Sequence, residues 1–100
     1  GRPRYFDDTV KAGGDMLKRG SVVVSSAGRD KGAFLAVLRL EPDGVWIADG
    51  RRRPLERPKR KNPRHVAETP FTAEEASMAT NRELRRTLAA AKMKAASPDA

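Results

Sequence analysis

The chain has 100 residues and no cysteine, and it carries a formal charge of +8 from 21 basic and 13 acidic side chains. This length suits one small domain, and the absence of cysteine excludes disulfides, thiolate zinc sites, iron–sulfur clusters and a cysteine nucleophile. The single histidine argues against a histidine-based metal site. The lack of any run of 10 apolar residues argues against a membrane span and a secretory signal. We therefore expect a basic, soluble, cytoplasmic protein without a cofactor.

The first residues lack a regular pattern. Segment 1–16 shows neither helical nor strand periodicity and contains Gly13 and Gly14, so we expect a flexible N-terminal tail. Residues 20–48 hold 10 of the 18 Val, Ile, Leu and Phe residues of the chain. The ordered core is therefore predicted in that central region.

Three strands follow, and β-branched or alternating apolar residues predict them at 20–25, 34–40 and 45–48. Apolar residues occupy both parities of the second strand, so both of its faces can be partly buried and we assign no inward face. Asp43 and Gly44 indicate a hairpin turn before the third strand, because glycine tolerates a positive φ. Asp49 and Gly50 mark another turn after it.

Prolines punctuate the next part of the chain. Pro54, Pro58 and Pro63 cannot donate backbone hydrogen bonds, which favours extended chain or an edge strand. Residues 65–68 are predicted as a last short strand. Short strands at about ten-residue spacing favour a small barrel over a βαβ unit.

The chain becomes helical in character after Pro70. Two capping boxes are predicted, Thr72 with Glu75 and Thr80 with Glu83. Residues 81–94 are rich in good helix formers, and Leu84, Leu88 and Ala91 form a narrow apolar stripe. This stripe fits against the strands or against a partner, and residues 95–100 are expected to fray.

Nearly all of the excess charge lies in residues 51–65, which we call the basic segment. It carries 8 basic side chains against Glu56 alone, whereas residues 1–50 have a net charge of +1 and residues 66–100 are neutral. Such a block points to a polyanion: RNA, DNA or an acidic membrane surface.

Blander roles for the basic segment are a solvated linker without a partner and a nuclear import signal at 58–61. Short basic matches of the latter kind are common by chance in basic proteins. A membrane surface is disfavoured, because Leu55 is the sole apolar anchor and three prolines prevent an amphipathic helix. A nucleic acid is the partner that we favour.

A glycine-bounded loop connects the first two predicted strands. Gly28 and Gly32 permit backbone angles that other residues avoid, and Arg29 and Lys31 are presented between them. A nucleotide-binding P-loop is excluded, because only three residues separate the glycines and Ala33 follows the second.

From Gly20 through this loop to Val37, the sequence resembles the KOW motif of ribosomal proteins and NusG-type transcription factors. It is closer still to small bacterial KOW-domain RNA-binding proteins, which are similar to large-subunit ribosomal proteins of archaea and eukaryotes. The stretches that carry this likeness span about residues 17–90 and are Ser26–Gly32, Ala48–Gly50, Pro58–Lys61, Arg64–His65 and Thr80–Arg86.

The resemblance implies an SH3-like β-barrel at 17–68, a helical extension at 69–100, and binding to RNA, above all ribosomal RNA. Residues 1–16 have no counterpart in it. Arg51, Arg52 and Arg53 stand where such proteins usually carry one or two acidic residues. This departure raises the positive charge and leaves the RNA interpretation intact.

We predict that RNA is bound mainly through its phosphate backbone and shape, since arginine outnumbers lysine in the basic segment and few aromatic side chains are available. The predicted RNA-binding residues are Lys18, Arg19, Arg29, Lys31, Arg51, Arg52, Arg53, Arg57, Lys59, Arg60, Lys61, Arg64 and His65. Trp46 is the best candidate for base stacking, although a core position is the commoner role, and Phe34 and Phe71 rank behind it.

No catalytic constellation is present, so an enzyme is not expected. Glu74 and Glu75 are adjacent and, on a helix, would point about 100° apart rather than face each other. The protein is expected to be a monomer. The alternative function is a protein-interaction module of the NusG type. It would dock on transcription or ribosomal proteins through a groove of the barrel or through the Leu84 and Leu88 face of the helix.

Overall fold

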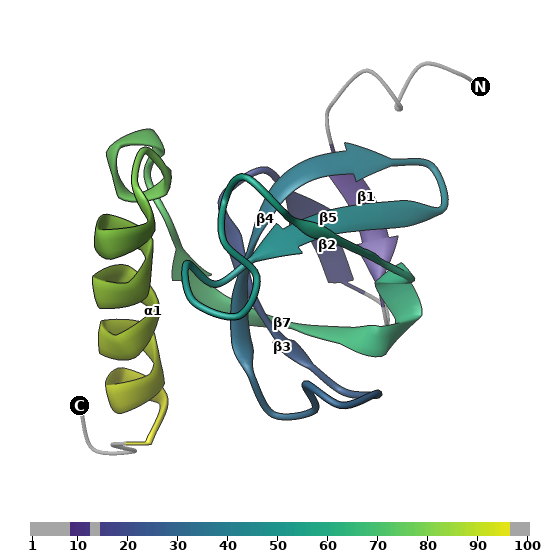
Figure 1. The fold of residues 1–100 in the computed structure, drawn as a ribbon. Helices are drawn as coiled ribbons and strands as arrows, with labels where there is room; N and C mark the ends of the chain where they lie inside the picture. The colour runs from purple at the N-terminus through teal and green to yellow at the C-terminus, as the bar shows by residue number, and fades with distance from the viewer. Residues whose placement is uncertain (1–8, 13–14, 97–100) are drawn as a thin grey trace.

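A computed structural model of the chain describes residues 9–12 and 15–96. It contains a five-stranded antiparallel sheet, a separate two-stranded hairpin and one C-terminal helix (Figure 1). The strands are β1 (Thr9–Ala12), β2 (Asp15–Lys18), β3 (Ser21–Ser25), β4 (Phe34–Glu41), β5 (Gly44–Ala48), β6 (Lys59–Lys61) and β7 (Val66–Thr72). Two short 3-10 helices, η2 (Pro63–His65) and η3 (Glu75–Met78), precede the helix α1 (Asn81–Ala95). The prediction of a mainly β domain followed by a helix is confirmed.

The large sheet has the strand order β6-β5-β4-β3-β7 and is covered on both faces. The first core cluster contains Leu17, Val23, Leu35, Val37, Val45, Ile47 and Val66. The second contains Val22, Ala36, Ala48, Ala73, Met78, Leu84, Leu88 and Ala91. Leu17 joins the first cluster from the N-terminal hairpin, while α1 supplies three residues of the second. Figure 1 shows the hairpin and α1 on different sides of the sheet.

Both faces of β4 are partly buried, as the sequence of the second predicted strand allows. Leu35 and Val37 are fully buried in the first cluster, and Ala36 between them is fully buried in the second. Because successive side chains point to opposite faces of a strand, a sheet covered on both faces needs apolar residues at both parities.

The N-terminal region differs from expectation. Segment 1–16 was expected to be a tail, but β1 and the first half of β2 lie within it, and the two strands pair as an antiparallel hairpin, with Thr9 opposite Lys18. The pairing is between backbones, and so it needs no alternation of apolar residues.

Two further boundaries also differ. Strand β7 runs to Thr72, four residues beyond the expected end of the barrel at 68. The turn before β5 is formed by Pro42 and Asp43, because Gly44 already pairs with Glu41. A Cβ on Gly44 would lie 2.5 Å from Arg60 Cζ. Glycine is therefore needed here to make room for the Arg60 side chain, and a positive φ is not the reason.

One of the two predicted capping boxes is wrong. Thr72 ends β7, and the 3-10 helix that follows has no side-chain cap at Glu74. The other is confirmed in its first half, since Thr80 Oγ1 accepts the backbone N–H of Glu83 at 3.1 Å and α1 begins at the next residue. Ala95 ends the helix, and residues 97–100 lie outside the described part of the chain.

Strand β6 is a short edge strand between Pro58 and Pro63, as the prolines predict. It pairs only with β5, with Ile47 opposite Lys59 and Val45 opposite Lys61. Within the described residues, no helix has both the length and the apolar character that crossing a membrane requires.

A candidate polyanion-binding pocket

The loop between β3 and β4 adopts the conformation that its glycines predict. Gly28 has a φ of 86° and Gly32 has a φ of 90°, values that L side chains rarely adopt. The Gly32 N–H donates to Ser25 O at 2.8 Å, and the Ser25 N–H donates to Ala33 O at 2.9 Å. These bonds close the loop, which we call the glycine loop (residues 26–32), and they leave Arg29 and Lys31 exposed.

The side chain of Lys61 in β6 holds the glycine loop. Lys61 Nζ donates to Ala27 O at 3.0 Å and to Asp30 Oδ1 at 3.1 Å. The Ser25 hydroxyl lies 2.9 Å from the same two acceptors. Burial opposes ionisation of Asp30, but the hydrogen bonds from Ser25 and Lys61 and the charge of Lys61 outweigh it and lower the pKa of Asp30.

The first part of the basic segment is a structured loop. Asp49 Oδ1 accepts the backbone N–H groups of Arg51 at 2.8 Å and Arg53 at 2.9 Å. The Asn81 side chain accepts the Leu55 N–H at 2.7 Å, which fixes this loop to the start of α1. A solvated linker would leave these backbone groups to water, so residues 51–55 of the basic segment form a structured loop.

Helix α1 holds the same loop from a second point. Arg85 Nη1 donates to Gly50 O at 2.8 Å. Gly50 has a φ of 78°, and a Cβ on it would lie only 2.5 Å from Asn81 O. The helix therefore lies directly against the backbone that leads into Arg51.

The glycine loop and the basic segment meet at an open pocket of about 670 Å³. Six cationic residues from the glycine loop, the basic segment and α1 line it: Arg29, Lys31, Arg52, Arg53, Lys59 and Lys92. The rest of the lining is Asp30, Gly32, Ala33, Leu35 and Asp49. The sequence could not show whether the glycine loop and the basic segment are neighbours, and the structure brings them together.

The two acidic side chains of the pocket are already engaged. Asp49 accepts backbone N–H groups of the basic loop, and Asp30 accepts Lys61 and Ser25. For the cations that line the pocket, no ion pair is found within the described part of the chain. The pocket therefore has a positive potential that attracts an anionic ligand.

Three predicted RNA-binding residues have other contacts. The Lys61 side chain is only 6% exposed and pairs with Asp30. Arg60 pairs with Glu41 at 2.8 Å and with Asp43 at 2.7 Å.

Arg19 is the third of these residues. It pairs with Glu75 at 2.7 Å and also donates to the Leu38 carbonyl. We therefore remove Lys61 from the candidate interface and assign Arg19 and Arg60 to exposed ion pairs of the fold.

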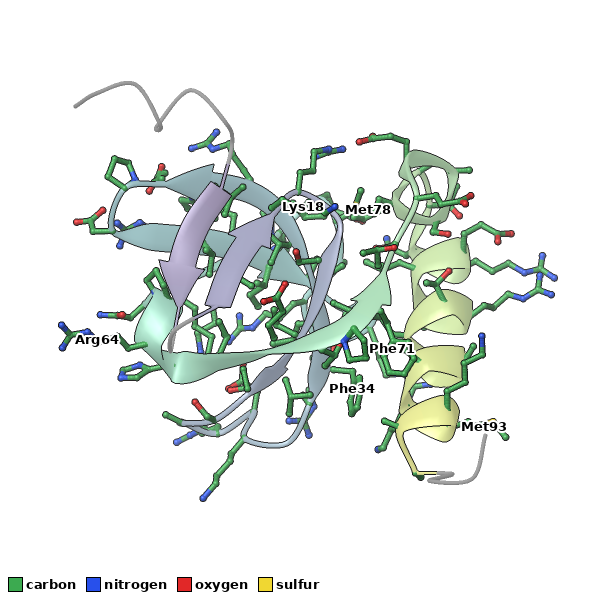
Figure 2. The ribbon with its side chains drawn as sticks, turned by 180° about the vertical axis from the view of Figure 1, so that it is seen from behind. Lys18, Phe34, Arg64, Phe71, Met78 and Met93 are labelled. Carbon is green, nitrogen blue, oxygen red and sulfur yellow. The ribbon has the colours of Figure 1, made fainter. Side chains whose placement is uncertain are left out.

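The remaining predicted residues are exposed but do not line the pocket: Lys18, Arg51, Arg57, Arg64 and His65. Arg64 and His65 belong to η2, whose start is capped by Asn62. Figure 2 shows Arg64 on the far side of the sheet from α1, pointing outward.

Aromatic side chains lie elsewhere. Trp46 is half-buried in a separate groove of about 340 Å³ with Leu38, Arg39 and Pro58, and the Arg39 guanidinium carbon lies 5.5 Å from its ring centroid. Phe34 and Phe71 pack in the second core cluster, beside α1 in Figure 2. No aromatic residue is among the described residues that line the pocket.

Lys92 is the pocket residue that the sequence analysis missed. It lies four residues after Leu88, which itself lies four residues after the fully buried Leu84. Residues four apart share one face of a helix, so the spacing already places Lys92 at the end of the buried stripe. That spacing was the available signal.

Among the described residues, no cluster of three or more histidine and acidic side chains could hold a metal ion. A comparison of the chain with protein-family models finds no match, and neither does a search of the curated proteins.

Proposed function

We propose that the chain binds RNA through this cationic pocket and that it is a KOW-type domain with an SH3-like barrel, associated with ribosomal RNA. The observation that carries the proposal is the convergence of six cations from the glycine loop, the basic segment (with Lys59 of β6) and α1 on one pocket. Both of its carboxylates are held by internal hydrogen bonds.

Fold and loop support the KOW part of this proposal. The glycine loop joins two antiparallel strands, and its two glycines have positive φ angles. The five short antiparallel strands are of the kind that a small barrel is built from.

The mode of recognition follows from the lining. Lysine and arginine neutralise phosphates and release condensed counterions, which makes the affinity electrostatic and dependent on salt. If about five cations engage phosphates, log affinity falls with log salt at a slope of about −3.5 for single strands and about −4.5 for a duplex. Because none of the described residues that line the pocket is aromatic, backbone and shape are read in preference to unstacked bases.

The alternative of a protein-docking helix face is not supported. Leu84 is fully buried and Leu88 is 5% exposed, both packed in the second core cluster of the domain itself. The sheet therefore covers this face, and a NusG-type role would fall to a groove of the barrel, the other surface predicted for it.

A four-residue substitution tests the proposed function. Replacing Arg52, Arg53, Lys59 and Lys92 by serine should weaken binding to a short fluorescein-labelled RNA hairpin by about 100-fold near 0.1 M salt and flatten the salt slope by about 3. The matched control replaces Arg39, Arg82, Arg86 and Lys94 by serine. These exposed residues lie outside the pocket and outside the predicted RNA-binding set, and their replacement removes the same charge.

The control should lose far less affinity than the pocket variant. Equal losses would mean diffuse charge attraction and would overturn the pocket as the site. Co-sedimentation of the two variants with ribosomal subunits from a cell extract then tests the ribosomal association, which fails if the unmodified chain stays in the supernatant.

A further inference from the structure

The hydrogen bonds inside the glycine loop do not balance without β6. Ala27 O and Asp30 Oδ1 are both within 2.9 Å of the Ser25 hydroxyl, but a hydroxyl has one proton and can serve only one of them at a time. The Lys61 ammonium has three protons and reaches both acceptors, at 3.0 and 3.1 Å. Lys61 is therefore the group that satisfies Ala27 O and Asp30 Oδ1 at once, while Asp30 Oδ2 is buried without a partner among the described residues.

Burial of this ion pair costs desolvation free energy. The side chain of Lys61 is 6% exposed and that of Asp30 is 16% exposed. Buried ion pairs can often be replaced by apolar side chains without loss of stability, so stability alone does not explain this one. The contacts themselves point to the purpose, since every acceptor of Lys61 belongs to the glycine loop.

We propose that Lys61 is a positioning residue for RNA binding: it holds the glycine loop so that Arg29 and Lys31 already line the pocket before RNA arrives. The inference rests on the proposed function and assigns to Lys61 a role different from that of the other cations. Its own charge faces Asp30 and contacts no phosphate.

The wrapping of the loop around the ammonium supports this role. A Cβ on Gly28 would lie 3.6 Å from Lys61 Nζ and 3.5 Å from Asp30 Oδ1, so the loop backbone is packed against the ion pair. A loop that is ordered in advance does not pay its ordering entropy on binding, and the apparent affinity rises accordingly.

Asp30 offers a test in which two explanations predict opposite signs. Asp30→Asn removes one negative charge from a pocket that binds a polyanion, so electrostatics alone predicts tighter RNA binding. If Lys61 and Asp30 hold the loop, the same substitution weakens binding by about fivefold, because the binding-competent loop is less populated. Asp43→Asn is the matched control, since this 85% exposed residue changes the charge equally without touching the glycine loop.

The closing experiment compares Lys61→Met with Lys59→Met, two residues apart on one strand. In Lys61→Met, amide exchange at Gly32 and Ala33 of the free protein should quicken about tenfold beyond any change at core strand amides. Affinity for the labelled RNA hairpin should fall with the salt slope unchanged. Lys59→Met should leave loop exchange unchanged and reduce the slope by about 0.9.

A double variant guards against simple unfolding. Lys61→Met with Asp30→Leu keeps the net charge and replaces the buried pair by apolar groups, so it should fold. Faster loop exchange and weaker RNA binding in this folded variant support the proposal. Unchanged loop exchange in both Lys61 variants overturns it, and so does a salt slope that falls with Lys61 as it does with Lys59. If RNA binding resists every pocket substitution while the loop loosens, the proposed function fails and the positioning of the loop stands.

Discussion

Three consecutive cations of β6 illustrate how little a residue type says about its role. Lys59 lines the pocket, Arg60 pairs with Glu41 and Asp43 on the other face, and Lys61 is buried against the glycine loop. Alternation along the strand separates them, because Lys59 and Lys61 share one face and Arg60 has the other. From the sequence, all three are predicted to bind RNA in the same way.

Gly50 gives a prediction at this scale. Gly50→Ala should destabilise the fold more than Gly32→Ala does, although both residues have a positive φ. At Gly32 no atom lies within 4 Å of the new Cβ, so only backbone strain of about 1–2 kcal/mol applies. At Gly50 the Cβ would also collide with Asn81 O, which should add about 1–3 kcal/mol. Urea denaturation of both variants measures the difference, and equal costs would contradict close packing of α1 on Gly50.

Glu41 gives a pH dependence. Arg60 above all lowers the pKa of Glu41 from its usual 4.5 to about 2. A carboxyl whose pKa is lower in the folded state stabilises the fold above pH 4.5, and this contribution is lost as the pH falls toward 2. Glu41→Gln should therefore lower the melting temperature at pH 6 and make little difference below pH 2. Thermal melts across this range test it, and a constant difference at all pH values would be inconsistent with an ionised Glu41 as the cause.

Long-range pairing decides which local signals are used at the scale of the elements. Thr72 and Thr80 each precede a glutamate by three residues, yet only Thr80 caps a helix. Strand β7 extends to Thr72 because that residue pairs with Ser21 of β3. A pairing between residues so far apart in the chain is invisible in a local motif, and it overrides the capping preference.

The two threonines form a matched pair of variants. Thr80→Ala should destabilise the domain by about 1 kcal/mol through the loss of the cap on the Glu83 N–H. Thr72→Ala should change the helix content little, since this exposed residue caps no helix. Circular dichroism with urea denaturation measures both effects. A larger loss of helix in Thr72→Ala would reverse the assignment of the cap.

Over the whole molecule, the central strands and the helix could be predicted from sequence, while the contacts between segments could not. The β-branched run Val22–Val24 and the stripe of Leu84 and Leu88 are local patterns whose burial the structure confirms in all but the half-buried Val24. The hairpin of β1 and β2 has no such pattern. The meeting of Arg29 with Arg52 and the inward position of Lys61 depend on three-dimensional packing, which charge counts do not contain.

The second core cluster couples the helix to the sheet, so the domain should unfold as one unit. Leu84→Ala should cost about 2–5 kcal/mol, because Leu84 is fully buried in that cluster. Fluorescence of Trp46 in β5 and helical circular dichroism should report the same shifted transition. Two separate transitions would mean that α1 is a detachable arm rather than part of the core.

The gathering of six cations around one pocket has a consequence for the free protein. Like charges held this close repel one another, and salt screens the repulsion over about 10 Å at 0.1 M. Added salt should therefore raise the melting temperature of the free domain while it weakens the RNA complex. Melts and binding titrations in parallel salt series test this opposition, and a free domain that loses stability with salt would contradict it. If salt does raise the melting temperature, the free domain is held in its binding-ready form at the expense of its own stability, and RNA relieves the repulsion on binding.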